Sequence, residues 1–185
     1  VNIDMTRNNE NDRFFYSHPI YADLININRE NNFLFRTEIC WYKQNVVGRA
    51  TDWGSYMNSA NPIIRRNHEY ILVWSKDQHK LEGDSSLSDM TKEEFCKYTL
   101  STWFIQPETR KISEHPCPFP VELPYRVIKL FTYKDDIVLY PFAGTGTTCV
   151  AAKRSKRRYI GIDNNNKFVD YAKKRVDSEE DIFSE

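Results

Sequence analysis

The residues of this sequence that could do chemistry gather in a turn between two apolar runs near its C-terminal end. Residues 137–140 (IVLY) lead into a turn that carries Gly144 and Gly146, where the absence of side chains lets a ligand approach the backbone. A second apolar run, residues 159–162, ends at Asp163. Because ligands of open α/β sheets bind outside the carboxyl ends of the strands, the glycines and Asp163 are expected at one edge. A carboxylate at that edge suits the hydroxyl groups of a ribose.

A helix is expected between the two apolar runs, which makes the segment a strand, helix and strand unit. Thr147 or Thr148 is predicted to cap the start of this helix, and Ala151 and Ala152 are predicted to pack it against a sheet. The basic residues that follow, between positions 153 and 158, are interpreted as a solvated helix end in preference to a DNA contact.

The spacing within the turn separates three kinds of nucleotide-binding motif. A phosphate-binding P-loop requires Gly-Lys-Ser/Thr after its glycines, whereas this chain has Gly146, Thr147 and Thr148 there. The dinucleotide fingerprint requires a third glycine at the position of Cys149, which disfavours a dehydrogenase-like domain. The remaining pattern, FAGTG at residues 142–146, resembles the FxGxG motif of S-adenosyl-L-methionine (AdoMet) methyltransferases. A glycine turn in some other α/β domain is the alternative on this stretch alone.

Composition and charge narrow the class of protein. The 185 residues suffice for one domain with a hydrophobic core, and 26 basic side chains balance 26 acidic ones. Any contact with DNA must therefore be local, because the chain has no overall basic excess. No apolar run has the length of a membrane span and no secretory signal is recognisable, so a cytoplasmic protein without membrane contact is expected. The four cysteines form no Cys-x-x-Cys pair, so no metal site is predicted.

Further helices and strands are expected on the N-terminal side of the glycine turn. A helix that carries Ile20, Leu24 and Ile27 on a core-facing side is the first of them. Residues 33–42 and 68–74 alternate apolar and polar side chains well enough for two strands, which could pair as neighbours.

Two more helices are expected between these strands and the glycine turn. Ser88 or Thr91 could cap the first, and Glu94 could complete a capping box with Thr91. The second starts near Glu122 and is predicted to bury Leu123, Val127, Leu130 and Phe131.

A long loop between the two predicted strands has the composition of a nucleic-acid contact. Residues 44–67 combine guanidinium groups with aromatic rings, which suit phosphates and unstacked bases. A solvated surface loop with a few packed aromatic rings is the alternative. The candidate DNA-binding residues of this loop are Arg49, Trp53, Arg65 and Arg66.

Several segments together resemble one family, the bacterial and archaeal DNA amino-methyltransferases of restriction-modification type. The similarity is to the permuted arrangement, in which the AdoMet motif lies near the C-terminus, and it covers nearly the whole chain. The matching segments, in the order of the family, include GRATDWGSY, NPIIRRNHEYILVWSK, HPCPFPVELP, PFAGTGTT and YIGID.

This resemblance implies a reaction and a set of site residues. Such enzymes flip a cytosine or adenine out of double-stranded DNA and transfer the methyl group of AdoMet to its exocyclic amino group. Asp163 would hold the ribose hydroxyls, and no metal is implied. The cofactor-binding residues implied by the family pattern are His115, Pro116, Phe119, Phe142, Ala143, Gly144, Thr145, Gly146, Thr147, Thr148 and Asp163.

The fold class expected from the resemblance is α/β, a Rossmann-like AdoMet-dependent methyltransferase fold. It is expected to be incomplete, with an antiparallel strand pair and a small polar insert. A single partial domain is predicted, in which residues 1–76 carry the strands and the DNA-side loop, 77–112 form the insert and candidate target-recognition region, and 113–185 bind AdoMet.

Two departures from the family pattern qualify the expected activity. Tyr140 stands where the family usually has an aspartate before Pro-Phe, which bears on cofactor affinity. The family's catalytic motif, an Asp, Ser or Asn followed by Pro-Pro-Tyr, is absent from the sequence, so no catalytic residue is assigned. The chain is therefore interpreted as a C-terminal portion that requires a missing N-terminal segment, a complementary chain or self-association. A catalytically inactive remnant that binds DNA or regulates is the alternative, and the target base and recognition sequence stay open.

Overall fold

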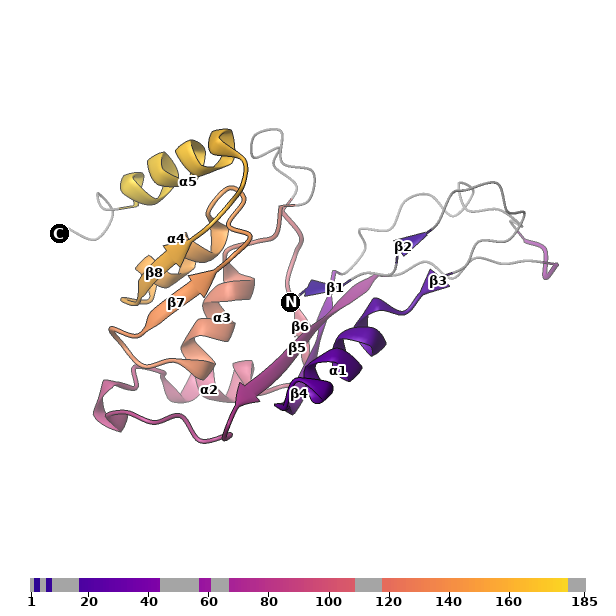
Figure 1. The fold of residues 1–185 in the computed structure, drawn as a ribbon, viewed down its shortest axis with the longest axis horizontal. Helices are drawn as coiled ribbons and strands as arrows, with labels where there is room; N and C mark the ends of the chain where they lie inside the picture. Colours follow the sequence, from indigo (N-terminus) through magenta and orange to yellow (C-terminus); the bar gives the residue numbers. More distant parts are fainter. Residues whose placement is uncertain are drawn as a thin grey trace. The chain divides into compact units, whose positions relative to one another are not determined.

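A computed structural model of the chain describes residues 2–3, 6–7, 17–43, 57–60, 67–108 and 118–179 (Figure 1). The chain divides into two compact units. The first consists of Val1–Lys80 together with Leu100–Phe104, and the second of Leu81–Thr99 together with Ile105–Glu185. The segment 77–112, predicted as one insert, is thus divided between the two units.

The first unit is built on a four-stranded sheet with the strand order β1-β5-β4-β6. Its central strands, β4 (Phe33–Tyr42) and β5 (His68–Lys76), run antiparallel, which confirms the predicted pairing of neighbours. Strand β6 (Thr102–Phe104) adds to β4 in parallel, and β1 (Asn2–Ile3) adds to β5. Among the residues of this unit that the structure describes, the buried apolar side chains are those of Ile39, Trp41, Ile71, Leu72 and Trp103.

A helix and a short ribbon complete the first unit. Strands β2 (Thr6–Arg7) and β3 (Ser17–His18) pair antiparallel, and α1 (Ile20–Glu30) follows them. The expected core face of this helix is wrong in part, because none of its side chains is fully buried and Ile27 is 51% exposed. The helix contacts the sheet around Tyr21, whose ring centroid lies 5.6 Å from that of Tyr70. The apolar stripe that meets the sheet is therefore rotated away from Ile27.

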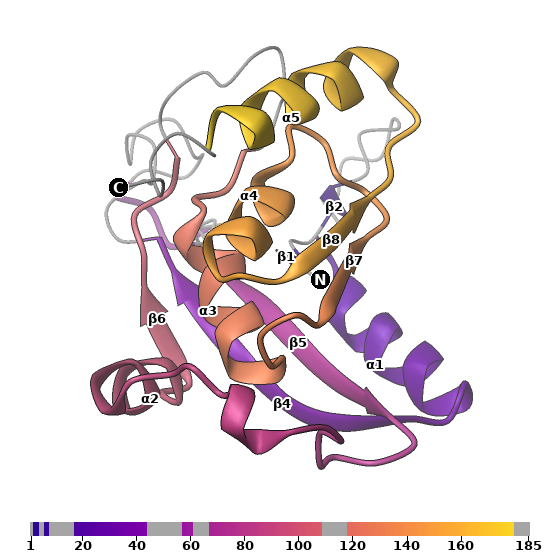
Figure 2. The same ribbon diagram turned by 90° about the vertical axis from the view of Figure 1, so that its left-hand side faces the viewer.

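The second unit contains the predicted motif of a strand, a helix and a strand (Figure 2). Strands β7 (Ile137–Tyr140) and β8 (Arg158–Gly161) pair in parallel and are joined by α4 (Thr147–Arg154). Helix α3 (Glu122–Phe131) precedes β7, and α5 (Asn166–Ser178) follows β8. These bounds confirm the two apolar runs as strands.

The core of this unit is formed where α3, α4 and β7 meet. Ala151 and Ala152 are fully buried beside Ile128, and Val138 of β7 packs against them. Small side chains on α4 allow this close packing of helix and strand, as predicted. The predicted buried face of α3 is correct for Leu123 and wrong in its other members, which are only half-buried.

The buried side of α3 instead includes two basic residues. Arg126 and Lys129 are 3% and 7% exposed. Arg126 forms an ion pair with Glu122 and lies 5.1 Å from the ring of Tyr98. Long aliphatic stems let such residues fill the space of apolar ones, provided that their charged ends find partners.

The polar segment before α3 carries the predicted capping box. Helix α2 (Lys92–Tyr98) follows a short 3-10 turn, η2 (Ser85–Leu87). The Thr91 hydroxyl accepts a hydrogen bond from the Glu94 amide at 3.1 Å, and the Glu94 carboxylate accepts one from the Thr91 amide at 2.9 Å. The helix start is therefore fixed by local sequence.

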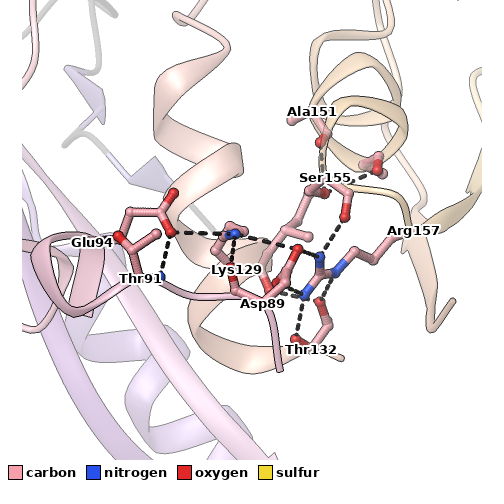
Figure 3. Close-up of polar contacts among 10 residues, drawn as sticks. Asp89, Thr91, Glu94, Lys129, Thr132, Ala151, Ser155 and Arg157 are labelled. Atoms are coloured by element: carbon pink, nitrogen blue, oxygen red, sulfur yellow. Dashed lines mark hydrogen bonds and ion pairs between the residues drawn. The ribbon is translucent and has the colours of Figure 1, made fainter. Parts of the chain in front are cut away.

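A buried ionic cluster joins this segment to the amino ends of β7 and β8 (Figure 3). The Arg157 guanidinium donates to both carboxylate oxygens of Asp89, at 2.8 and 2.9 Å, and to the Thr132 carbonyl at 2.8 Å. The Lys129 ammonium donates to the Asp89 carbonyl at 2.8 Å and lies 3.4 Å from the Glu94 carboxylate. Residues 85–98 are thereby fixed to the end of the sheet opposite the glycine turn.

The basic residues between positions 153 and 158 lie in the last turn of α4 and just after it, and the interpretation of a solvated helix end is wrong in part. Arg154, Lys156 and Arg158 are exposed, but several of these basic residues are bonded within the unit. The Arg157 side chain is fully buried, and Arg154 makes two hydrogen bonds to Glu179, at 2.7 and 2.8 Å. Lys153 donates to the Val176 carbonyl at 3.0 Å. These contacts lie far along the chain, so the neighbouring residues carry no signal of them.

Within the described ranges, no helix combines the length and apolar character that crossing a membrane requires.

Candidate functional site

The turn between β7 and α4 has the backbone conformation that its glycines predict. Gly144 and Gly146 have φ angles of 51° and 78°, in the left-handed region that favours glycine. Gly146 is the N-cap of α4, and its carbonyl accepts from the Val150 amide at 2.9 Å. The prediction that Thr147 or Thr148 caps this helix is therefore wrong. Both threonines are buried in its first turn, because the left-handed glycine starts the helix one residue earlier.

Asp163 joins the glycine turn to the end of β8. One carboxylate oxygen accepts from the Gly144 amide at 2.7 Å, and the other accepts from the Asn165 amide at 2.9 Å. The Ala143 amide donates to the Ile162 carbonyl at 2.7 Å and adds a second link. A carboxylate oxygen has more than one acceptor site, so these bonds leave Asp163 able to accept hydrogen bonds from a ligand.

A close contact between α4 and β8 explains why Cys149 can occupy the position of a third glycine. A Cβ atom added at Gly161 would lie 2.7 Å from the Cys149 sulfur and 3.1 Å from the Ala143 Cβ. The glycine that permits the close approach of helix and strand is thus Gly161 of β8, and no glycine is needed on α4. Burial raises the pKa of the Cys149 thiol, so this cysteine is a packing residue in the protonated form.

Tyr140 stands at the carboxyl end of β7, beside the turn. Its ring meets that of Phe119 edge-on, with centroids 6.4 Å apart. Burial raises the pKa of the Tyr140 phenol, and a hydrogen bond with Thr148 acts in the opposite direction. The phenol is therefore neutral at physiological pH, and it supplies an aromatic surface where the family pattern has an acid.

The predicted cofactor-binding residues differ in exposure. Phe142 is 81% exposed, whereas Ala143 and the three threonines of the FAGTGTT segment are buried. Their side chains shape the turn from inside, so the backbone of the turn, Phe142 and Asp163 are the groups left to meet a ligand. His115 and Pro116 lie outside the described residues, as do the predicted DNA-binding residues Arg49, Trp53, Arg65 and Arg66.

Sequence reasoning missed three residues that shape the turn. Gly161 was readable in principle, because a glycine inside an apolar strand marks a close backbone approach. Ala172 and Arg175 of α5 contact Gly146, Thr145 and Thr147. Nothing in the local sequence of α5 distinguishes them from its other residues.

Comparison with known families agrees with this geometry. A family model described as a DNA methylase (N6_N4_Mtase) matches residues 1–174. The chain belongs to this DNA methylase family. Membership explains why the glycine turn, the two strands and Asp163 occur together.

Two relatives within the family show how far the similarity extends. The type II methyltransferase M.BglI from Bacillus subtilis is 35% identical over 141 residues, which are 74% of this chain and 39% of the relative. The type II methyltransferase M2.DpnII from Streptococcus pneumoniae is 40% identical over 166 residues, which are 88% of this chain and 58% of the relative. The chain thus spans about half the length of these curated relatives.

A solved structure has the same fold. A protein of Thermus thermophilus, provisionally assigned as a DNA modification methylase and crystallised with S-adenosyl-L-methionine, superposes with a TM-score of 0.79. The two are 27% identical, and the match covers 96% of this chain and 68% of the other. The expected α/β methyltransferase fold is therefore confirmed.

Proposed function

We propose that this chain binds AdoMet at the turn between β7 and α4, as the cofactor-binding part of a DNA methyltransferase. Its reaction is methyl transfer to the exocyclic amino group of cytosine or adenine in double-stranded DNA. The single observation that carries the proposal is the hydrogen bond from the Gly144 amide to the Asp163 carboxylate. It places a glycine turn and a carboxylate together at the carboxyl ends of two parallel strands.

The residues of the turn fit such a ligand. The left-handed conformations of Gly144 and Gly146 present backbone in place of side chains, which gives a nucleoside close access. Asp163 has acceptor capacity left for the two ribose hydroxyls. The edge-on pair of Phe119 and Tyr140 offers an aromatic wall beside the turn.

AdoMet, when bound, supplies a methyl group on a positively charged sulfur. The role of this chain is to bind and orient that group while the target base lies outside the DNA stack. His115, Pro116 and Phe142 are proposed to close the cofactor pocket. Arg49, Trp53, Arg65 and Arg66 are proposed to contact DNA through phosphates and an unstacked base.

We further propose that catalysis requires a segment with the Pro-Pro-Tyr type motif, which the sequence lacks. Within the second unit, four apolar side chains of β7, of β8 and of the residue after β8 are each about half exposed. They are Ile137, Leu139, Ile160 and Ile162, at 52%, 58%, 49% and 53%. Parallel sheets are ordinarily covered on both faces. Such a segment, in the same polypeptide or a complementary chain, is the proposed cover. A substrate of cellular DNA agrees with a cytoplasmic location.

Titration calorimetry with AdoMet tests the cofactor site. The wild-type chain is expected to bind one AdoMet, and Asp163→Ala is expected to abolish measurable binding, because it removes both the ribose acceptor and the bond to Gly144. Asp170→Ala, an exposed carboxylate on α5, is the matched control and should bind as the wild type does. Binding of a nicotinamide dinucleotide but not AdoMet would contradict the proposal.

Methyl transfer from labelled AdoMet to DNA tests the activity. The chain alone is expected to be inactive, and addition of a separately expressed segment that carries the catalytic motif is expected to restore transfer. Persistent inactivity of a well-folded, AdoMet-binding assembly would contradict the assignment as an enzyme.

A further inference from the structure

One side of α5 lies directly against the glycine turn. A Cβ atom added at Gly146 would be 2.8 Å from the Ala172 Cβ and 3.1 Å from the Ala172 Cα. The turn thus packs directly against the methyl group and backbone of Ala172, which leaves no room for a side chain at position 146. Arg175 is one helical turn further along the same side of α5.

Arg175 makes two hydrogen bonds to the turn. Its Nη1 atom donates to the Thr145 carbonyl at 3.2 Å and to the Thr147 hydroxyl at 3.0 Å. Thr145 and Thr147 are only 3% and 4% exposed, so these acceptors are shielded from water. One guanidinium nitrogen therefore bridges the residues on either side of Gly146.

Helix α5 is itself fixed along α4, from its first half to its C-terminal end. Val176 is buried against Cys149 and Val150, and its carbonyl accepts from Lys153 at 3.0 Å. Glu179, just after the helix, accepts two hydrogen bonds from Arg154. Because α5 is fixed to α4 by these contacts, Arg175 ties the glycine turn to a helix that is itself held in place.

We propose that Arg175 is a positioning residue for the cofactor turn. Its two hydrogen bonds orient the peptide of Thr145 and the first residue of α4, and so preorganise the Gly144 to Gly146 backbone that meets the ligand. This proposal rests on the proposed AdoMet site. Arg175 need not touch the ligand, since it acts through Thr145 and Thr147.

Calorimetry on Arg175 variants measures the effect on AdoMet binding. Arg175→Met keeps the aliphatic stem and removes the donors, and about a tenfold loss of affinity is expected for a lost charged hydrogen bond. Arg175→Lys should recover part of this loss, because an ammonium can still donate to one acceptor. Lys174→Met, an exposed neighbour on α5, is the control and should bind within about twofold of wild type. Equal affinity of Arg175→Met and wild type would overturn the proposal.

A double-mutant cycle locates the effect in the contact itself. Thr147→Val removes the hydroxyl that accepts from Arg175. If Arg175 acts partly through this hydroxyl, the two substitutions together should weaken binding less than the product of their separate effects. Full additivity would argue that Arg175 affects the site by another route.

Hydrogen exchange on the ligand-free protein gives a readout that does not depend on the cofactor. Amides of residues 144–146 should exchange several-fold faster in Arg175→Met, while those of β7 and β8 keep their wild-type rates. A uniform increase across the unit would indicate loss of stability alone and would overturn the positioning role. If wild type fails to bind AdoMet, the proposed function fails, yet this measurement still tests whether Arg175 holds the turn.

Discussion

At the scale of single residues, Gly161 sets the distance between the cofactor helix and its strand. Cys149 of α4 approaches the β8 backbone so closely that a methyl group at position 161 would overlap its sulfur. The helix has a larger residue, Cys149, at the position of the third glycine, and the strand has a glycine, Gly161, opposite it. The chain can therefore depart from the three-glycine pattern while helix and strand stay in close contact. The packing of α4 on β8 beside the site therefore depends on Cys149 and Gly161 together.

Gly161→Ala is expected to destabilise the protein by about 1–3 kcal/mol, the usual cost of overpacking. The added Cβ would lie 2.7 Å from the Cys149 sulfur and 3.1 Å from the Ala143 Cβ. In a Cys149→Ala background the same substitution should cost less, because the sulfur is gone. Urea denaturation of the four proteins of this cycle measures the difference. An unchanged cost in both backgrounds would show that Cys149 is not the obstacle.

At the scale of secondary-structure elements, the ionic cluster of Asp89, Glu94, Lys129 and Arg157 connects α2, α3 and the amino end of β8. Burial tends to raise the pKa of Asp89, but hydrogen bonds and charge from Arg157, with a contribution from Lys129, outweigh it and hold the pKa below its usual value. The fully buried Arg157 side chain depends on this carboxylate. The ion pair therefore fixes residues 85–98 as part of the second unit.

Asp89→Asn is expected to lower the free energy of unfolding at pH 7 by about 3 kcal/mol, since it leaves a buried guanidinium without its charged partner. A depressed carboxyl pKa contributes stability above the unfolded value of 3.8, and this contribution is lost as pH falls through the lower folded pKa. The gap between wild type and variant should therefore shrink below about pH 4. Denaturation series at several pH values measure this gap.

Glu93→Gln, an exposed carboxylate in the first turn of α2, is the control for the loss of one negative charge. It should change stability by no more than about 0.5 kcal/mol. A gap between wild type and Asp89→Asn that stays constant down to about pH 2 would contradict the ion-pair explanation.

The elements that sequence predicted well are those whose signals are local. The alternation of β4 and β5, the apolar runs of β7 and β8 and the Thr91 capping box each depend on residues within a few positions. The buried side of α3 could not be predicted, because the partners of Lys129 lie far along the chain: Glu94, and Asp89, which is 40 positions away. Arg175 is likewise missed, since its acceptors lie about 30 positions earlier.

At the scale of the whole molecule, the absence of net charge limits how the proposed contact with DNA can be made. With 26 basic and 26 acidic residues, affinity must come from a few local contacts. The candidate site follows from sequence as far as the turn and Asp163, because a motif fixes them. The assignment of DNA contacts to the loop of residues 44–67 stays a prediction from its composition and from the family resemblance.

Replacing Arg65 and Arg66 by Gln together is expected to weaken DNA binding and to reduce the slope of log K against log salt by up to about 2. Each arginine that contacts a phosphate releases about one counterion on binding. Fluorescence anisotropy with labelled duplex between about 50 and 200 mM salt measures the slope. Lys173→Gln with Lys174→Gln on α5 is the matched control, and an equal reduction there would remove the assignment of the loop.

The division of the chain between its units limits how the protein can be cut or recombined. Residues 81–99 belong to the second unit, but the next five residues return to the first and place Trp103, 1% exposed, in its core. A single cleavage at position 80 would therefore divide the first unit, because the C-terminal fragment would carry residues 100–104 along with the whole second unit. Exchange of the cofactor-binding part between relatives would need two junctions, one on each side of β6, in addition to the one at position 80.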